Sequence, residues 1–208
     1  MYTHSKQILA GGLPLANAKK AIIMLHGRGA SAQSIISLQD NLDLSDASIL
    51  APQAANSSWY PYSFLVPVEQ NQPALDSALQ LVDQLVAEIA AAGIPLNQIY
   101  FLGFSQGACL ALEYAGRHAA RYGGVLAFTG GLIGEHVDLD NYKGDFAGTP
   151  VFISTGNPDP HVPIERVEES MAIFQKLNAN VTLKVYNGRA HTIQLEELQL
   201  ANELVLTN

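Results

Sequence analysis

At mid-chain stands the segment Ile99-Tyr100-Phe101-Leu102-Gly103-Phe104-Ser105-Gln106-Gly107-Ala108. It reads as an apolar strand, a Gly-x-Ser-x-Gly motif and then a helix-forming run that extends to about residue 118. This context distinguishes a nucleophile elbow, in which a serine sits on a strained strand-to-helix turn, from a chance match to a short motif. Gly103 and Gly107 lack a Cβ, so strand and helix can approach closely around the turn. The segment predicts a reactive serine at Ser105, in preference to a structural serine in a tight turn.

Similar apolar runs recur along the chain and alternate with helix-forming segments. We expect strands at residues 21–25, 48–51, 99–104, 124–128, 150–154 and 182–186, with a further edge strand at 6–9. We expect helices at residues 31–42, 74–92, 108–118, 164–179 and 194–206. Repeated strand–helix–strand order predicts an α/β fold with a mainly parallel central sheet and helices on both faces. No repeat or linker interrupts this pattern, so we expect residues 1–208 to form a single domain.

The composition restricts the classes of protein to which the chain can belong. Its 208 residues are 48% hydrophobic and 14% charged, which predicts a globular protein with a sizeable core. A formal net charge of −8, with scattered Lys and Arg, argues against nucleic acid and anionic membranes as partners. The single cysteine, Cys109, cannot form an internal disulfide and is expected to be an inert core thiol. Neither a secretory signal nor a membrane-spanning run is recognisable, so we expect a cytoplasmic protein.

A serine nucleophile needs a base to accept its proton and a third group to orient that base. On a sheet of this kind the expected order along the chain is Ser, then Asp or Glu, then His. His191 follows the last predicted strand, where a loop can place an imidazole over the carboxyl edge of the sheet, so it is the predicted base. The alternative is a histidine that caps the C-terminal helix. His161 and His136 are expected to be solvent-facing loop histidines.

Asp159 is the predicted acid, because it follows the strand at 150–154 and lies between two prolines. Pro158 and Pro160 stiffen the loop and restrict where the carboxylate points, which suits an orienting group. An ordinary turn aspartate is the alternative. Solvated surface carboxylates are expected in the irregular stretch 132–149, at Asp138, Asp140 and Asp145.

The tetrahedral intermediate of acyl transfer needs N–H donors for its oxyanion. One donor is expected to be the backbone N–H of Gln106, the residue after the candidate nucleophile. The other is expected from Arg28, in the loop Leu25-His26-Gly27-Arg28-Gly29-Ala30, whose glycines permit close backbone approach. His26 precedes Ser105 in the chain and is therefore expected to be structural, with its ring hydrogen-bonded to the loop backbone.

Four motifs occur in order along the chain: Leu25-His26-Gly27-x-Gly29, Gly103-Phe104-Ser105-Gln106-Gly107, Asp159-x-x-Val162-Pro163 and Gly188-x-x-His191. Together they resemble the carboxylesterase/phospholipase family of α/β-hydrolases, which includes the acyl-protein thioesterases. The resemblance implies an α/β-hydrolase fold without a large lid domain, and no metal or other cofactor. It implies a triad of Ser105, Asp159 and His191, with oxyanion donors at Arg28 and Gln106. The implied reaction is hydrolysis of carboxylic esters or thioesters of small to medium acyl groups through an acyl-enzyme.

The chain departs from the family pattern at Arg28, where many members carry an apolar residue such as leucine. If the guanidinium points into the cleft, it could bind a carboxylate or phosphate on the substrate. The alternative, which we favour, is an ion pair with a nearby Asp or Glu. A second departure, Ala108 in place of a frequent glycine, is a mild change within a helix.

Aromatic residues in the irregular stretch 56–72 are candidates for substrate contact. Trp59, Tyr60, Tyr62 and Phe64 could line a pocket or form a satellite core under a long loop, and the sequence favours neither. The expected partner is a small-molecule ester or thioester, and both a monomer and a homodimer are compatible with the scaffold. Two alternatives stay open: an acyltransferase that uses the same triad, and a non-catalytic binding protein on a hydrolase scaffold.

Overall fold

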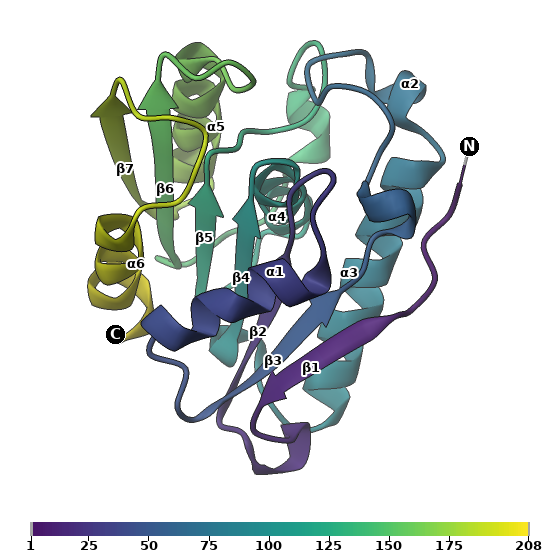
Figure 1. Ribbon diagram of the computed structural model, residues 1–208, viewed down its shortest axis with the longest axis vertical. Helices are drawn as coiled ribbons and strands as arrows, with labels where there is room; N and C mark the ends of the chain where they lie inside the picture. Colours follow the sequence, from purple (N-terminus) through teal and green to yellow (C-terminus); the bar gives the residue numbers. More distant parts are fainter. Residues whose placement is uncertain (1, 208) are drawn as a thin grey trace.

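Within residues 2–207, which the computed structural model describes, seven strands form one sheet (Figure 1). The strand order is β1-β3-β2-β4-β5-β6-β7. Only β1 runs antiparallel to its neighbour, and the remaining strands are parallel. The strands are β1 (Ile8–Gly12), β2 (Lys20–Leu25), β3 (Ala47–Pro52), β4 (Ile99–Phe104), β5 (Gly124–Phe128), β6 (Pro150–Asn157) and β7 (Asn180–Asn187).

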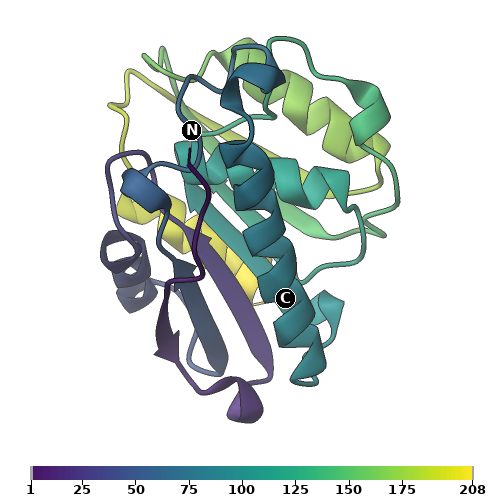
Figure 2. The ribbon, with the colours of Figure 1, turned by 90° about the vertical axis from the view of Figure 1, so that its right-hand side faces the viewer.

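Helices cover both faces of the sheet, as the two views in Figures 1 and 2 show. Buried side chains of α1 and α6 pack on one face, together with Ile22 and Met24 of β2. Buried side chains of α3, α4 and α5 pack on the other face, together with Ile23 and Leu25. A continuously apolar strand serves both cores, because successive side chains point to opposite faces. The helices are α1 (Ala32–Ile36), α2 (Val68–Asn71), α3 (Ala74–Ala91), α4 (Gln106–Arg117), α5 (Ile164–Lys176) and α6 (Leu195–Ala201).

The predicted α/β architecture is confirmed, with differences at the ends of elements. β4 and β5 have the predicted bounds, whereas β6 and β7 are each eight residues long because they pair along their whole length. The edge strand predicted at 6–9 lies instead at Ile8–Gly12, where its register with β3 runs from Ile8–Pro52 to Gly12–Ser48. Pairing with a neighbour far along the chain sets these bounds, so local sequence could not locate them.

Three predicted helices are shorter than expected. The helix after β2 ends at Ile36 and continues as the 3-10 turn Ser37–Asn41. α5 ends at Lys176, and Asn178 then adopts a left-handed conformation with φ 61° that a helix cannot continue. α6 ends at Ala201 and is followed by the π-helical turn Asn202–Leu206. Across residues 2–207, no helix combines the length and the apolar character that spanning a bilayer requires.

The parallel strands place their carboxyl ends at one edge of the sheet, the upper edge in Figure 1. The segments that follow β4, β5, β6 and β7 therefore meet there, although they are far apart in sequence. The long stretch after β3 also lies at this edge (Figure 1). Ligands of open α/β sheets bind at this edge, and the candidate site lies there too.

Candidate active site

The turn between β4 and α4 holds Ser105 in a conformation that few non-glycine residues adopt, with φ 53° and ψ −117°. Such strain is typical of a serine at a nucleophile elbow. The two motif glycines are required by contact: a Cβ on Gly103 would lie 2.2 Å from the carbonyl oxygen of Gly107. A Cβ on Gly107 would lie 2.0 Å from the carbonyl oxygen of Leu25. The Ser105 N–H donates to the carbonyl of Phe128 in β5 at 2.9 Å, which ties the turn to the neighbouring strand.

The structure brings the three predicted residues Ser105, His191 and Asp159 together from three separate loops. His191 Nε2 lies 2.8 Å from Ser105 Oγ, and His191 Nδ1 lies 2.8 Å from Asp159 Oδ2. An ionised carboxylate can only accept, so Nδ1 carries the hydrogen and Nε2 is free to accept the serine proton. The Asp159 side chain is fully buried, and His191 is 19% exposed at the cavity. The arrangement can therefore move a proton from Ser105 to His191.

Asp159 is held by its own loop as well as by the imidazole. Its Oδ1 accepts the backbone N–H groups of His161 at 2.9 Å and Val162 at 3.0 Å. Burial acts to raise the pKa of Asp159, but the hydrogen bonds from His191 and from these two N–H groups outweigh it. The net effect is a pKa below the ordinary value, so the carboxylate stays ionised at neutral pH.

Two backbone N–H groups are available beside Ser105, those of Arg28 and Gln106. Neither has an acceptor among residues 2–207. Both residues line the same cavity as the serine. Gly27 brings the first loop against the elbow, because a Cβ there would lie 3.3 Å from the ring of Phe104 and 3.6 Å from the Cβ of Ser105. These N–H groups meet the chemical requirement for oxyanion donors, that of being unpaired next to the nucleophile.

No acid within residues 2–207 pairs with the side chain of Arg28, so the ion pair favoured from the sequence is wrong. Its Nη1 donates to Ser58 Oγ at 2.9 Å and to the carbonyl of Pro61 at 2.8 Å. Its Nη2 donates to the carbonyl of Tyr62 at 2.6 Å. The guanidinium thus holds the segment after β3 at the mouth of the cavity. These partners lie 30 to 34 positions from Arg28 along the chain, so no local pattern in the sequence indicates them.

The side chain of Gln106 holds the same segment from inside. Its Oε1 accepts the N–H of Trp59 at 2.9 Å, and its Nε2 donates to the carbonyl of Tyr60 at 2.8 Å. Ser58 Oγ contacts both Gln106 and Arg28. Sequence reasoning missed Ser58, because a lone serine in a loop carries no recognisable signal. The two residues that supply the unpaired N–H groups therefore also anchor one wall of the cavity.

A cavity of about 750 Å³ opens at Ser105 and His191. Its walls include Tyr60, Phe64 and Leu65 from the segment after β3, Phe104 at the end of β4, and Val162 in the loop after β6. Tyr62, which also lines it, is 57% exposed at the mouth.

Trp59 does not line this cavity, so the candidate substrate contact at Trp59 is wrong and the core alternative holds. Its side chain is completely buried, and its indole N–H donates to the carbonyl of His26 at 2.8 Å. An indole N–H needs an acceptor when it is buried, and the loop after β2 supplies one. The stretch is therefore partly core and partly cavity wall: Trp59 belongs to the core, while Tyr60 and Phe64 are buried residues that also face the cavity.

The remaining histidines divide between structure and site. His26 is buried, and its ring is hydrogen-bonded to backbone as expected: Nδ1–H donates to the carbonyl of Gly27 at 2.7 Å and Nε2 accepts the N–H of Ala54 at 3.1 Å. His136 is exposed, as predicted. His161 is exposed too, but it lines the cavity and its ring lies edge-on to that of His191, with centroids 4.9 Å apart. Sequence reasoning missed this proximity, because it depends on how the fold places the two loops relative to each other.

Cys109 is buried and lines the cavity, beside Tyr60. Burial raises the pKa of its thiol to about 12, which keeps it protonated and unreactive at neutral pH. The expectation of an inert core thiol agrees with this environment.

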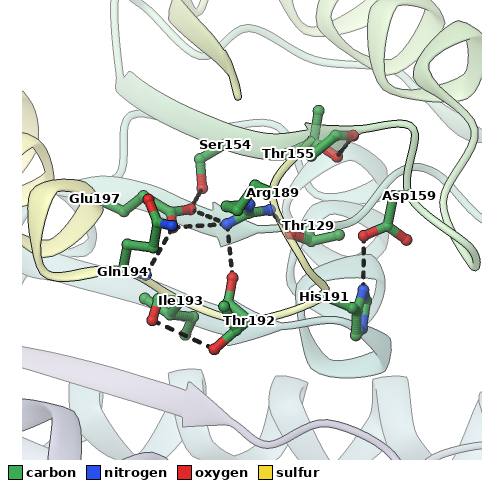
Figure 3. Close-up of polar contacts among 11 residues, drawn as sticks. Thr129, Ser154, Thr155, Asp159, Arg189, His191, Thr192, Ile193, Gln194 and Glu197 are labelled. Atoms are coloured by element: carbon green, nitrogen blue, oxygen red, sulfur yellow. Dashed lines mark hydrogen bonds and ion pairs between the residues drawn. The ribbon is translucent and has the colours of Figure 1, made fainter. Parts of the chain in front are cut away.

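Sequence reasoning also missed a polar cluster behind the loop that carries His191. Arg189 and Glu197 form a buried ion pair that contacts Ser154 and Thr129 (Figure 3). A basic and an acidic residue eight positions apart, across a loop and a helix start, do not form a recognisable pattern. The cluster lies next to His191 in the chain and is considered further below.

The parallel sheet, the strained serine turn and the absence of a large lid in the described chain define an α/β-hydrolase. A family model described as Phospholipase/Carboxylesterase matches residues 13–208, which is most of the chain. The chain belongs to the phospholipase/carboxylesterase family, and it is a hydrolase of that type.

Individual relatives agree with this assignment. The chain is 64% identical to a phospholipase/carboxylesterase from Dyadobacter fermentans known from its crystal structure, with 99% of each chain covered and a TM-score of 0.98. It is 30% identical to acyl-protein thioesterase 1 of Eremothecium gossypii, covering 92% of this chain and 88% of the relative. It is 29% identical to acyl-protein thioesterase 1 of Kluyveromyces lactis, covering 88% and 89%. These similarities support an esterase or thioesterase activity.

Proposed function

We propose that the chain hydrolyses carboxylic esters or thioesters by two-step acyl transfer through Ser105. The observation that carries this proposal is the unbroken sequence of contacts from Ser105 Oγ through His191 to Asp159, with both distances at 2.8 Å. This is the arrangement that a serine needs in order to become a nucleophile at neutral pH. Membership of a hydrolase family supports the same reaction.

In the first step, His191 accepts the proton of Ser105 as the hydroxyl oxygen attacks the carbonyl carbon of the substrate. The N–H groups of Arg28 and Gln106 stabilise the negative charge that develops on the carbonyl oxygen. His191 then donates its proton to the leaving alcohol or thiol, which leaves an acyl group on Ser105. In the second step His191 deprotonates a water molecule as its oxygen attacks the acyl carbon; the bond to Ser105 Oγ then breaks, His191 returns the proton to Oγ, and the acid is released. Asp159 keeps Nδ1 protonated and stabilises the imidazolium that forms in each step.

Replacement of the nucleophile tests the proposal most directly. For Ser105→Ala we expect kcat for a p-nitrophenyl ester to fall by about 10⁴- to 10⁶-fold, and Asp159→Ala to lose somewhat less. Circular dichroism and thermal melting should show that the variants fold. A folded Ser105→Ala protein that retains its esterase activity would exclude Ser105 as the nucleophile.

The cavity predicts which acyl groups the site accepts. Its volume of about 750 Å³ and walls such as Phe64, Leu65 and Val162 suit an apolar chain. Each methylene that enters should raise kcat/KM by up to about fourfold, until the cavity is full. A series of p-nitrophenyl esters from acetyl upwards, alongside matched acyl-thioesters, measures this. An optimum at medium length is expected, whereas a steady fall from acetyl would contradict the assignment of this cavity to the acyl chain.

An acyltransferase with the same triad is the second candidate, since an alcohol or amine can replace water in the second step. A fluorophosphonate probe needs an activated serine, so labelling of Ser105 without turnover of any ester favours the transferase. Absence of labelling favours a binding protein on a hydrolase scaffold. The cytoplasmic location, the single domain over residues 1–208, and the monomeric or homodimeric state stay predictions from the sequence.

A further inference from the structure

A buried polar cluster lies behind the His191 loop and takes no direct part in the proposed chemistry (Figure 3). Arg189 Nη1 donates to both carboxylate oxygens of Glu197, at 2.6 Å each. The same carboxylate accepts Ser154 Oγ at 2.5 Å and the backbone N–H of Gln194 at 2.7 Å. The side chains of Arg189 and Glu197 are 2% and 0% exposed, so the ion pair is withdrawn from water.

The Arg189 guanidinium links the residues on the two sides of His191 within its loop. Arg189 precedes His191 by two residues, and its Nη1 also donates to the carbonyl of Thr192, the residue directly after His191, at 2.6 Å. His191 therefore lies between two points that the same arginine connects. On the outside, Gly156 leaves room for this loop, because a Cβ there would lie 2.8 Å from the carbonyl oxygen of Arg189. The backbone around His191 is restricted from both sides.

The same guanidinium is also hydrogen-bonded to Thr129, the residue that follows β5 beneath the site. Arg189 Nη2 donates to Thr129 Oγ1 at 2.5 Å, and the Thr129 N–H donates to the carbonyl of Ser154 at 2.6 Å. Thr129 has φ 59°, an unfavourable conformation for a β-branched residue. The residue before it, Phe128, accepts the N–H of Ser105 through its carbonyl. One connected set of contacts thus runs from the histidine loop to the backbone of Ser105.

Stability alone does not explain why such an ion pair is buried here. Desolvation of two charges offsets most of their attraction, and apolar residues of similar size often give equal or greater stability. In addition, the directional hydrogen bonds of the pair fix the orientation of the two side chains. Forked guanidinium donors and a carboxylate with several acceptor sites define one geometry, which an apolar core does not.

We propose that Arg189 and Glu197 are positioning residues that set the His191 imidazole at the correct place relative to Ser105. The proposal rests on the proposed function, because it assigns a role in the proton transfer between these two side chains. Neither residue lines the cavity at Ser105. A displacement of about 1 Å in a catalytic group can cost about 10²-fold in rate. Loss of the pair is therefore expected to lower kcat and to leave KM nearly unchanged.

The experiment separates position from stability with three variants: Arg189→Met, Glu197→Leu and the double variant. Each single variant leaves one charge buried without its partner, which is strongly destabilising, and the double variant removes that charge. We expect the double variant to be more stable to urea than either single variant. We also expect all three to show kcat lower by about 10²-fold, with a similar loss in the rate of fluorophosphonate labelling and little change in KM. Kinetics are measured at a temperature where every variant is folded.

Arg117→Met provides the matched control. Arg117 Nε contacts Glu113, which is also completely buried, but this pair lies on α4 and has no contact with the histidine loop. We expect this variant to lose stability and to keep its kcat. A second comparison replaces Thr129: Thr129→Ser keeps the hydroxyl that accepts from Arg189, and Thr129→Val keeps the shape without it. Thr129→Ser should retain kcat and Thr129→Val should lose it.

Recovery of kcat together with stability in the double variant would overturn the positioning role, and so would a wild-type kcat in either single variant. Failure of the unaltered protein to react with the fluorophosphonate would instead overturn the proposed function, and the positioning role with it. Labelling of the unaltered protein at Ser105 distinguishes the two failures.

Discussion

At the residue scale, the backbone and the side chain of Arg28 have different roles, and the same is true of Gln106. Their backbone N–H groups, beside Ser105, have no acceptor in the described part of the chain, while their side chains hold the segment from Ser58 to Tyr62. A change in either side chain therefore reaches the cavity wall and the proposed oxyanion site together. This double use explains how an arginine can stand at a position where an apolar residue is common.

Arg28→Leu tests that interpretation. The variant removes three hydrogen bonds to the segment after β3, each with a net contribution of about 1 kcal/mol or less at this exposed position. We expect KM to rise by up to about tenfold, to the same extent for neutral and anionic esters, because the guanidinium acts on the wall. Assays on a matched pair of esters measure this. A loss confined to the anionic ester would show that the guanidinium binds substrate charge directly.

At the element scale, the elbow between β4 and α4 needs glycine at two positions, because a side chain there would overlap the neighbouring backbone. Three backbones meet there: those of β4, of α4 and of the loop after β2. A Cβ on Gly103 would strike the first turn of α4, and one on Gly107 would strike the end of β2. The turn places Ser105 clear of the sheet because the chains on either side approach so closely.

We expect Gly107→Ala to lower the free energy of unfolding by more than about 4 kcal/mol or to prevent folding, because the new Cβ meets backbone that cannot move aside. Gly93→Ala is the matched control. Gly93 has φ 96° but open space around its Cβ position, so only the backbone conformation is penalised, by about 1–2 kcal/mol. Urea unfolding of the two variants gives the comparison, and equal losses would contradict the close approach at the elbow.

At the scale of the whole molecule, two histidines, His26 buried and His4 half-buried, join the loop after β2 and the N-terminal segment to the segment after β3. His26 Nε2 accepts the N–H of Ala54, and His4 Nδ1 accepts the N–H of Ala55. Both rings are therefore neutral in the folded protein, since a protonated ring would have no acceptor to offer. Burial lowers the pKa of His4 and of His26, although backbone carbonyls that accept from their other nitrogens act in the opposite direction.

The free energy of unfolding should consequently fall as the pH is lowered from about 7 to 5. The unfolded histidines titrate near pH 6.5 and the folded ones at lower pH, so the unfolded chain binds more protons in this window. Asp159, with its lowered pKa, adds a separate loss at more acidic pH, below about 4. Urea unfolding across this range measures both effects. His26→Gln should be less stable but should show a shallower slope between pH 7 and 5; a steeper slope would contradict the assignment.

Much of the fold and of the candidate site could be predicted from local pattern. The glycines around Ser105, the prolines around Asp159 and the position of His191 after the last strand are all readable within a few residues. The order of these motifs along the chain predicts their meeting, because parallel strands bring their carboxyl ends to one edge. The proposed catalytic roles still await the kinetic tests.

The alternation of strands and helices and the class of site follow from the amino-acid sequence alone, because they depend on periodicity and on the backbone conformations that single residues require. Three features required the folded chain: Arg28 binds carbonyl groups, Trp59 belongs to the core, and Arg189 pairs with Glu197 behind His191. Each of these depends on which partners the fold places within about 3 Å of a long side chain. Rotamers and burial make that choice, and neither is encoded in the spacing of residues along the chain.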